Sequence, residues 1–285
     1  MEAIPLRQVE APAITALVAE MCREANIYPG DEVAEALKKA LTREESPAGR
    51  EALRQLIENL EIARREQLPL CQDTGFAVFF VEWGQEVHLT GGSLQDAINE
   101  GVRRGYREGC LRKSVVADPL HRVNTGDNTP AVIHTALVPG DRIKITFAPK
   151  GGGSENMSAL KMLRPSDGVE GVVDFVVRCV REAGPNPCPP IVVGVGLGGT
   201  FEQVAVIAKK ALLRPLGRSH PDPYYAALEQ KMLEKVNELG IGPQGFGGRI
   251  TALAVHIETF PAHIASLPVA VNLNCHAARH AERIL

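Results

Sequence analysis

The sequence predicts an α/β or α+β fold in which a helical N-terminal region precedes mixed strands and helices. Two observations support this fold class. Apolar residues recur at helical spacing through about the first 65 residues, and short apolar runs of strand type then alternate with further helical segments. The 285 residues contain no internal repeat and no linker, so we expect a single domain over residues 1–285, with its helical portion ending at about residue 66.

The expected elements follow from the hydrophobic period of each segment. The first helices are expected at residues 9–26, 32–41 and 51–65. An apolar run at 76–81 and an alternating segment at 141–147 are typical of strands. Later helices are expected at 167–180, 201–212 and 221–239, and later strands at 191–195, 250–259 and 267–272.

Composition excludes several classes of protein. Hydrophobic residues make up 45% of the chain and charged residues 23%, which is close to the average of globular domains. The net charge of −3 argues against a nucleic-acid-binding surface. No apolar run reaches the roughly 18 residues of a membrane span, and Met-Glu-Ala-Ile-Pro at the start lacks a signal-peptide pattern. We therefore expect a cytoplasmic protein that binds neither nucleic acid nor membrane.

Three of the six cysteines have no evident chemical role in the sequence. A cytoplasmic chain is not expected to carry a disulfide framework. Cys22 and Cys179 lie among apolar residues of helical pattern, where a cysteine is usually a small buried hydrophobe. Cys110 follows Arg-Glu-Gly and fits either a buried or a loop setting.

The other three cysteines, Cys71, Cys188 and Cys275, lie beside Gly, Pro or Asn in predicted loops. They are far apart in the sequence and form no C-x-x-C pair, which argues against a zinc ribbon. Three thiolates are one short of the four that normally bind an iron–sulfur cluster. A cluster held by three cysteines keeps one iron open, and an open metal position supports Lewis-acid chemistry.

Cys71-Gln72-Asp73-Thr74-Gly75 places a thiolate, an amide and a carboxylate within three residues. This grouping suits a loop that holds a metal and a proton donor together, and Asp73 could carry a proton to or from a substrate. The alternative is that Asp73 only caps a turn through its own backbone.

The settings of the other two loop cysteines each allow two interpretations. Prolines on both sides of Cys188 predict a stiff, extended segment that suits a metal ligand, although a buried structural thiol is the alternative. After Cys275, His276 and His280 are four residues apart and could share one helix face as zinc ligands do. A solvated histidine pair is the alternative, because no third ligand of metalloprotease type is present.

Three glycine-rich segments are further candidates for binding. Lys-Gly-Gly-Gly-Ser-Glu-Asn at 150–156 offers successive amides for a carboxylate, or else forms a flexible turn. Residues 194–199 match G-x-G-x-x-G, but no ribose-binding acid follows, and tight strand-to-helix packing explains the glycines. The stretch 240–249 is either a long turn or a loop that approaches a ligand or a partner chain.

Five of these motifs occur together in order, and their assembly resembles the N-terminal domain of class I (iron–sulfur) fumarate hydratases, specifically the free-standing alpha subunit of the two-subunit form. The resemblance spans almost the whole chain. The motifs are Cys-Gln-Asp-Thr-Gly at 71–75, Lys-Gly-Gly-Gly-Ser-Glu-Asn at 150–156, Asn-Pro-Cys-Pro-Pro at 186–190, Val-Gly-Val-Gly-Leu-Gly-Gly-Thr at 193–200 and Asn-Cys-His-Ala at 274–277.

The resemblance implies a cofactor and the residues that bind it. Cys71, Cys188 and Cys275 would hold a [4Fe-4S] cluster in a cleft, with one iron that no cysteine binds and that is left for the substrate. In the family, the residue matching Asp73 has a proton-transfer role and the one matching Gln72 touches the substrate.

The resemblance also implies three further contacts. An active-site histidine shortly before the third cysteine corresponds to His263. The arginine that contacts a substrate carboxylate corresponds to Arg112, with Arg122 as the alternative. Gly152, Gly153 and Ser154 would lie against the substrate.

The implied activity is the reversible hydration of fumarate to L-malate. Single-chain members of the family continue into a second domain that completes the active site, so we expect a separate beta subunit here, within a higher oligomer. The related L-tartrate dehydratase alpha subunit usually has Cys-Thr where this chain has Ser154-Glu155, which favours fumarase. A tartrate dehydratase alpha subunit, a non-catalytic cluster-binding or assembly subunit, and a nucleotide-dependent enzyme are the alternatives.

Overall fold

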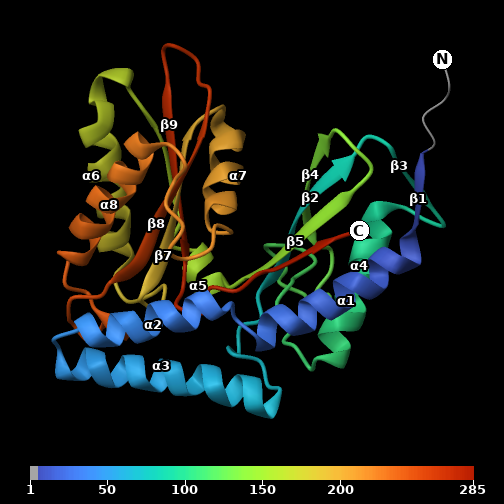
Figure 1. Cartoon of the computed structure of the whole chain (residues 1–285), viewed down its shortest axis with the longest axis horizontal. Coiled ribbons are helices and arrows are strands. Elements are labelled where there is room, and N and C mark those ends of the chain that lie inside the picture. Colours follow the sequence, from blue (N-terminus) through green and yellow to red (C-terminus); the bar gives the residue numbers. More distant parts are fainter. Residues whose placement is uncertain (1–5) are drawn as a thin grey trace. The chain divides into compact units, whose positions relative to one another are not determined.

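The computed structural model describes residues 6–285, so the N-terminal pentapeptide considered for a signal peptide lies outside the described residues. The chain forms two compact units from interleaved segments (Figure 1). Unit 1 contains the described residues of Met1–Pro29 with Ile62–Gly151 and Arg279–Leu285, and unit 2 contains Gly30–Glu61 and Gly152–Ala278. The helical N-terminal region is thus divided between the units. The expectation of a single domain stays a prediction.

Unit 1 has a mixed four-stranded sheet with strand order β10-β5-β2-β4. Strand β2 pairs with β4 in parallel and with β5 in antiparallel orientation. Helices α1 and α4 pack against each other, and their apolar side chains share one core with those of β2 and β5. The elements are β1 (Arg7–Glu10), α1 (Ala11–Ile27), β2 (Phe76–Gly84), β3 (Val87–Thr90), α4 (Leu94–Glu108), β4 (Val132–Val138), β5 (Ile143–Lys150) and β10 (Ala281–Ile284).

Unit 2 has a second mixed sheet, with strand order β6-β9-β7-β8. Helices α6 and α8 cover one face of this sheet and α7 covers the other (Figure 1). The elements are α2 (Asp31–Arg43), α3 (Pro47–Glu66, which extends past the unit boundary), α5 (Gly152–Glu155), β6 (Ala159–Leu163), α6 (Gly168–Ala183), β7 (Ile191–Gly198), α7 (Phe201–Ala211), α8 (Pro223–Asn237), β8 (Ala252–Phe260) and β9 (Leu267–Asn274).

The glycines of β7 allow helix α7 to lie unusually close to the sheet. A Cβ on Gly194 would come within 2.2 Å of the Ala208 carbonyl oxygen, and one on Gly196 within 2.3 Å of the Val204 carbonyl oxygen. Both positions therefore require glycine because the helix backbone occupies the side-chain space. This confirms strand-to-helix packing as the reason for these two glycines of the G-x-G-x-x-G match.

The predicted fold class is confirmed, and the strongly periodic segments form the expected elements. The three helices predicted before residue 66 correspond to α1, α2 and α3, and the segment 191–195 lies in β7, in which every residue is buried. Helix α4 and strands β1, β3, β4, β6 and β10 were not expected. Within residues 6–285, no helix is long and apolar enough to cross a membrane.

Candidate functional site

Cys188 and Cys275 lie at the same end of the sheet of unit 2. Cys188 comes shortly before β7, and Cys275 directly follows β9. These strands are antiparallel neighbours with Val192 opposite Asn274, so the start of one meets the end of the other. The backbone N–H of His276 donates to the Cys188 carbonyl at 3.3 Å. The fold thus brings together two cysteines that are far apart in the sequence.

The segment around Cys188 is a turn, and the predicted extended conformation is wrong. The Cys188 N–H donates back to the Pro185 carbonyl at 2.9 Å, and Cys188 itself has φ of 55°. Such left-handed backbone is uncommon for residues other than glycine and often occurs at functional positions. The Cys188 side chain is exposed, which also excludes the alternative of a buried structural thiol.

The glycine-dense stretch 240–249 holds this turn in place. Gln244 donates to the Pro189 carbonyl twice, from its backbone N–H at 2.8 Å and from its side-chain Nε2 at 2.6 Å. His276 Nδ1 lies 3.1 Å from the Cys188 carbonyl oxygen and 3.1 Å from Gln244 Nε2. The stretch therefore approaches the cysteine turn. Residues 275–280 are not helical, so His276 and His280 do not share the expected helix face.

The glycine loop at 151–155 is anchored to the same end of the sheet as the two cysteines. Asn272 on β9 donates to Glu155 Oε2 at 3.0 Å, and Lys209 forms an ion pair with the same carboxylate. Ser154 is buried, and a Cβ on Gly153 would lie 3.6 Å from the Asn186 carbonyl oxygen. Within unit 2, the loop is therefore an ordered neighbour of the Cys188 turn.

Unit 1 carries the Cys71–Gly75 loop, and side chains from other elements bind its carbonyl groups. Tyr106 on α4 donates its hydroxyl to the Thr74 carbonyl at 2.8 Å and to the Gly75 carbonyl at 3.1 Å. Burial raises the pKa of Tyr106 well above its usual value, so the hydroxyl stays a neutral donor. Asn128 is fully buried and donates from Nδ2 to the Gly75 carbonyl at 3.2 Å.

Asp73 is half-buried, and its carboxylate lies close to the backbone of Gly75 and of Gly151. Oδ1 accepts the Gly75 N–H at 3.1 Å, which is the turn-capping interaction considered for this residue. A Cβ on Gly151 would lie 3.2 Å from Oδ2. The carboxylate therefore faces the backbone of the first residue of the glycine loop, a position that also suits contact with a ligand.

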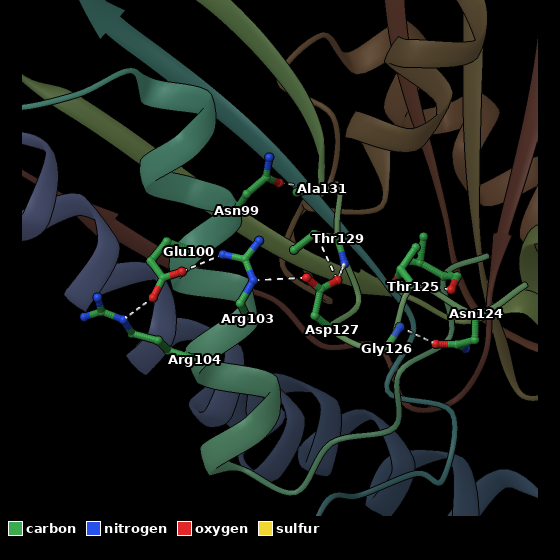
Figure 2. A network of polar contacts seen from close by, with 11 residues as sticks. Asn99, Glu100, Arg103, Arg104, Asn124, Thr125, Gly126, Asp127, Thr129 and Ala131 are labelled. Atoms are coloured by element: carbon green, nitrogen blue, oxygen red, sulfur yellow. Dashed lines mark hydrogen bonds and ion pairs between the residues drawn. The ribbon is translucent and has the colours of Figure 1, made fainter. Parts of the chain in front are cut away.

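A network of polar contacts joins the segment 124–131 to helix α4 (Figure 2). Arg103 bridges Glu100 and Asp127, and Asp127 accepts both the backbone N–H and the hydroxyl of Thr129. Side-chain hydrogen bonds from Arg104 and Arg103 lower the pKa of Glu100 and keep the network charged. Such exposed pairs add little stability, but together they fix the segment that carries Asn128.

The residues predicted to bind the substrate through polar side chains, Gln72 and Arg112, both lie in unit 1. Gln72 is exposed beside Cys71, which is half-buried. Arg112 is also exposed, and its carbonyl accepts the Thr74 hydroxyl at 2.9 Å, so its backbone lies against the Cys71–Gly75 loop. Arg122 lies in an exposed turn with φ of 59°. It takes part in none of these hydrogen bonds of the Cys71–Gly75 loop. The assignment of Arg112, with Arg122 as the alternative, stays a prediction.

His263 is the predicted site residue that unit 2 does not bring to its two cysteines. It lies in the exposed loop between β8 and β9, at the opposite end of β9 from Cys275. A strand of this length separates its ends by roughly 25 Å. Its Nδ1 accepts the Ala265 N–H at 3.1 Å within that loop. An active-site role for His263 stays a prediction.

Arg279 lies beside the Cys71–Gly75 loop, although no sequence pattern predicted it as a site residue. Arg279 is buried, and its Nη2 donates to the carbonyl of Asp73. In the sequence it stands four residues after Cys275, at the end of Asn-Cys-His-Ala-Ala-Arg. A lone arginine is mostly a surface residue, so only the structure identifies it.

The remaining cysteines differ from the loop cysteines in burial and acidity. Cys22 and Cys179 are buried, as predicted, and burial raises the pKa of both thiols, that of Cys179 to about 11. Such thiols stay protonated and make poor metal ligands. Cys110 is exposed. Among residues 6–285, no three His, Cys, Asp or Glu side chains are grouped closely enough to hold a metal ion by themselves.

Comparison with known proteins identifies the family. The sequence model of the family described as fumarate hydratase (Fumerase) matches residues 15–284. A protein of Methanocaldococcus jannaschii with the provisional name L(+)-tartrate dehydratase subunit alpha is 46% identical over 274 residues, covering 94% of this chain and 96% of the relative. The L(+)-tartrate dehydratase subunit alpha of Escherichia coli strain K12 is 36% identical over 277 residues, covering 96% of this chain and 91% of the relative.

These matches cover nearly the whole chain, and the range 15–284 spans the positions of all five motifs that carry the sequence resemblance. The arrangement of Cys188, Cys275 and the glycine loop at one end of a sheet accompanies them in the structure. The chain belongs to the fumarate hydratase (Fumerase) family of hydro-lyases.

Proposed function

We propose that this chain is the alpha subunit of a hydro-lyase that reversibly hydrates fumarate to L-malate and that a separate beta subunit completes the active site. The observation that carries the proposal is the gathering of Cys188, Cys275 and the glycine loop at one end of the sheet of unit 2. Family membership over residues 15–284 supports the reaction class.

The proposed cofactor is a [4Fe-4S] cluster bound by Cys71, Cys188 and Cys275. The donor set fits, because thiolates are the usual cluster ligands, and these three side chains are exposed or half-buried whereas Cys22 and Cys179 are buried. The adjacency of Cys188 and Cys275 supports two of the three ligands. When bound, a cluster with one open iron would supply a Lewis acid that polarises a substrate oxygen.

The residues of this chain have three proposed roles in the reaction. Hydration places a proton on one carbon of the double bond and a hydroxyl group on the other, and Asp73 holds or moves that proton. The amides of the glycine loop at Gly152, Gly153 and Ser154 bind one substrate carboxylate. Arg112 and Gln72 contribute contacts to the same dicarboxylate.

A second candidate substrate comes from the relatives. Both the M. jannaschii and the E. coli proteins are named L(+)-tartrate dehydratase alpha subunits. These names also support the proposal of a beta partner, since an alpha subunit implies a second chain. The Ser154-Glu155 pair favours fumarate over tartrate, and the ion pair of Glu155 with Lys209 gives position 155 a role that threonine could not fill.

The experiment that tests the proposal uses the alpha and beta subunits purified together without oxygen. Fumarate, L-malate and L(+)-tartrate are each supplied, and iron, sulfide and the electron paramagnetic resonance signal are measured before and after substrate addition. We expect about four irons per alpha subunit, as one [4Fe-4S] cluster requires, and fumarate turnover above tartrate turnover. If the complex converts tartrate but not fumarate, the tartrate dehydratase function is the correct one. If a complex that contains the cluster converts neither substrate, the chain has an assembly role instead.

An Asp73→Asn variant tests the proton role within the same complex. We expect loss of turnover by about 100-fold with the cluster retained, because general acid–base catalysis contributes 10²–10⁴-fold. Asp118→Asn is the matched control, since Asp118 also caps a turn, accepting the backbone N–H groups of Leu120 and His121. Full activity of Asp73→Asn would exclude the role.

The location in the cytoplasm remains part of the proposal. All six cysteines are described by the structure, and none of them forms a disulfide. This is consistent with a reducing compartment, in which an exposed cluster would also be best preserved.

A further inference from the structure

Three consecutive carbonyl groups of the Cys71–Gly75 loop each accept a hydrogen bond from a buried side chain. Arg279 donates to the Asp73 carbonyl, Tyr106 to those of Thr74 and Gly75, and Asn128 to that of Gly75. These donors come from the segment after β9, from α4 and from the loop before β4. The position of Asp73 is therefore set from several sides of unit 1.

Arg279 differs from the other two donors in its remaining hydrogen-bonding groups. Its side chain is only 5% exposed, and neither Nε nor Nη1 has a hydrogen-bond partner or contact with solvent. Tyr106 has a single hydroxyl, which is bonded, and Asn128 is bonded at both ends of its amide, since its Oδ1 accepts the Ser114 N–H at 2.7 Å. Arg279 is thus a buried charge with an incomplete set of partners.

An incompletely paired buried guanidinium destabilises a protein, because it loses its hydration without full replacement. Holding one backbone carbonyl does not require a positive charge, as the neutral Tyr106 and Asn128 demonstrate in the same loop. The fold therefore retains at this position a group that a neutral donor or an apolar side chain of similar length would replace at lower cost. Groups that are costly to stability and yet retained are frequent at functional sites.

We infer that Arg279 is a positioning residue for the proposed hydration. It fixes the backbone of Asp73, so that the carboxylate stays between the Gly75 N–H and the Gly151 backbone. This inference rests on the proposed function, because the positioning matters for a proton transfer at Asp73. Its structural part, that Arg279 costs the chain stability, stands independently of any substrate.

The test compares Arg279→Met and Arg279→Lys in the anaerobic alpha–beta complex. Methionine fills similar space without charge, so we expect a melting temperature equal to or above that of the wild type. We expect kcat to fall by about 100-fold, as a displacement of roughly 1 Å at a catalytic group can do, with KM changed less than threefold and the iron content retained. Arg279→Lys should recover part of kcat.

Two further variants separate positioning from a general structural role. Arg283→Met removes an arginine of β10 that pairs with Glu24, and it should leave kcat unchanged. In an Asp73→Asn background, Arg279→Met should reduce kcat by much less than it does alone, because both changes disable the same group.

The outcomes distinguish this inference from the proposed function. A lower melting temperature with parallel losses of iron and kcat in Arg279→Met would make Arg279 a structural residue and overturn the inference. An unchanged kcat would overturn it as well. A wild-type complex that converts neither fumarate nor tartrate would instead refute the proposed function, while the melting temperatures would still report whether Arg279 costs stability.

Discussion

The Cys71–Gly75 loop of unit 1 and the Cys188–Cys275 pair of unit 2 are held by different kinds of interaction. Side chains of Arg279, Tyr106 and Asn128 bind the loop. The register of β7 and β9 and mainly backbone hydrogen bonds position the cysteine pair, with one further bond from the Gln244 side chain. A loop held by side chains can be displaced by a single substitution, whereas a pair held by strand register tolerates most substitutions. The geometry of the loop is therefore the more fragile of the two.

The largest effect is expected from the thiols themselves. Cys188→Ser keeps the turn, which depends on backbone bonds, but removes a proposed cluster ligand. We expect iron content to fall and turnover to drop by more than the 10–100-fold typical of losing a residue that only orients a metal ligand, with the melting temperature of the apo complex unchanged. Cys179→Ser is the control and should keep iron and turnover, since Cys179 is buried in the core of unit 2. Full activity of Cys188→Ser would remove Cys188 from the site.

Tyr106→Phe tests the fragility of the loop in unit 1. The Thr74 carbonyl loses its donor, while the Gly75 carbonyl keeps Asn128. We expect a loss of about 1–3 kcal/mol of unfolding free energy and a roughly tenfold fall in kcat from a displaced Asp73. Urea unfolding and steady-state kinetics measure the two effects.

Tyr224→Phe is the control, since Tyr224 is 58% exposed on α8. If Tyr106→Phe loses stability without any change in kcat, the position of Asp73 does not depend on the Tyr106 hydrogen bond. The loop would then not be more easily disturbed than the cysteine pair of unit 2.

Glu44→Gln tests the support of unit 2. This carboxylate is 1% exposed and accepts the backbone N–H groups of Glu45, Ser46, Arg249 and Ile250, which ties the start of α3 to the segment after Gln244. Glutamine offers one acceptor fewer, so we expect a loss of about 2 kcal/mol of unfolding free energy with little change in kcat. Glu45→Gln is the control, because its side chain is 73% exposed.

The pH dependence of the Glu44 contribution has a definite sign. Burial alone would raise its pKa, but the four backbone N–H groups outweigh burial and lower the pKa below 4.5. The contribution is then fully present above pH 4.5 and is lost as the pH falls through the lowered value of the folded state. Wild type and Glu44→Gln should converge in stability across that acidic window, and parallel curves would contradict this account.

The smallest effect is expected from Gln244→Ala. The Pro189 carbonyl still accepts the backbone N–H of residue 244, so the turn keeps one of its two bonds. We expect a loss below about 1 kcal/mol and turnover within twofold. Gln244→Gly removes the same side chain but suits the φ of 52° at this position, and it should be the more stable of the two. A large loss of turnover in both variants would show that side-chain contacts also determine the position of the cysteine pair in unit 2.

Sequence reasoning succeeded where the signal is local. Periodic apolar spacing predicted α1, α2, α3 and most later helices, and the raised pKa of the Cys22 and Cys179 thiols agrees with the interpretation of these residues as core. Helix α4 was missed although Ser93 caps it, with the Asp96 N–H donating to the Ser93 hydroxyl at 3.1 Å. The buried face of this helix includes Gly101 and Gly105, and glycine is unfavourable inside a helix, so local propensity argued against it.

Non-local features escaped prediction for a physical reason. The pairing of β10 with β5 joins residues more than 130 positions apart, and no local pattern specifies such a partner. The burial of Arg279 depends on the same long-range assembly. The cysteine motifs predicted a shared chemistry for Cys188 and Cys275, but only strand register explains why these two are adjacent.

The place of β10 at the edge of the sheet of unit 1 has a consequence for biosynthesis. Strand β5 gains its outer partner only when Ala281–Ile284 has left the ribosome, although β2, β4 and β5 are made more than a hundred residues earlier. Until then, the open side of β5 presents unpaired N–H and C=O groups, which are a template for pairing with another chain. Nascent chains in this state are exposed to aggregation, so we expect substitutions that weaken the pairing of this short strand to lower the yield of folded protein.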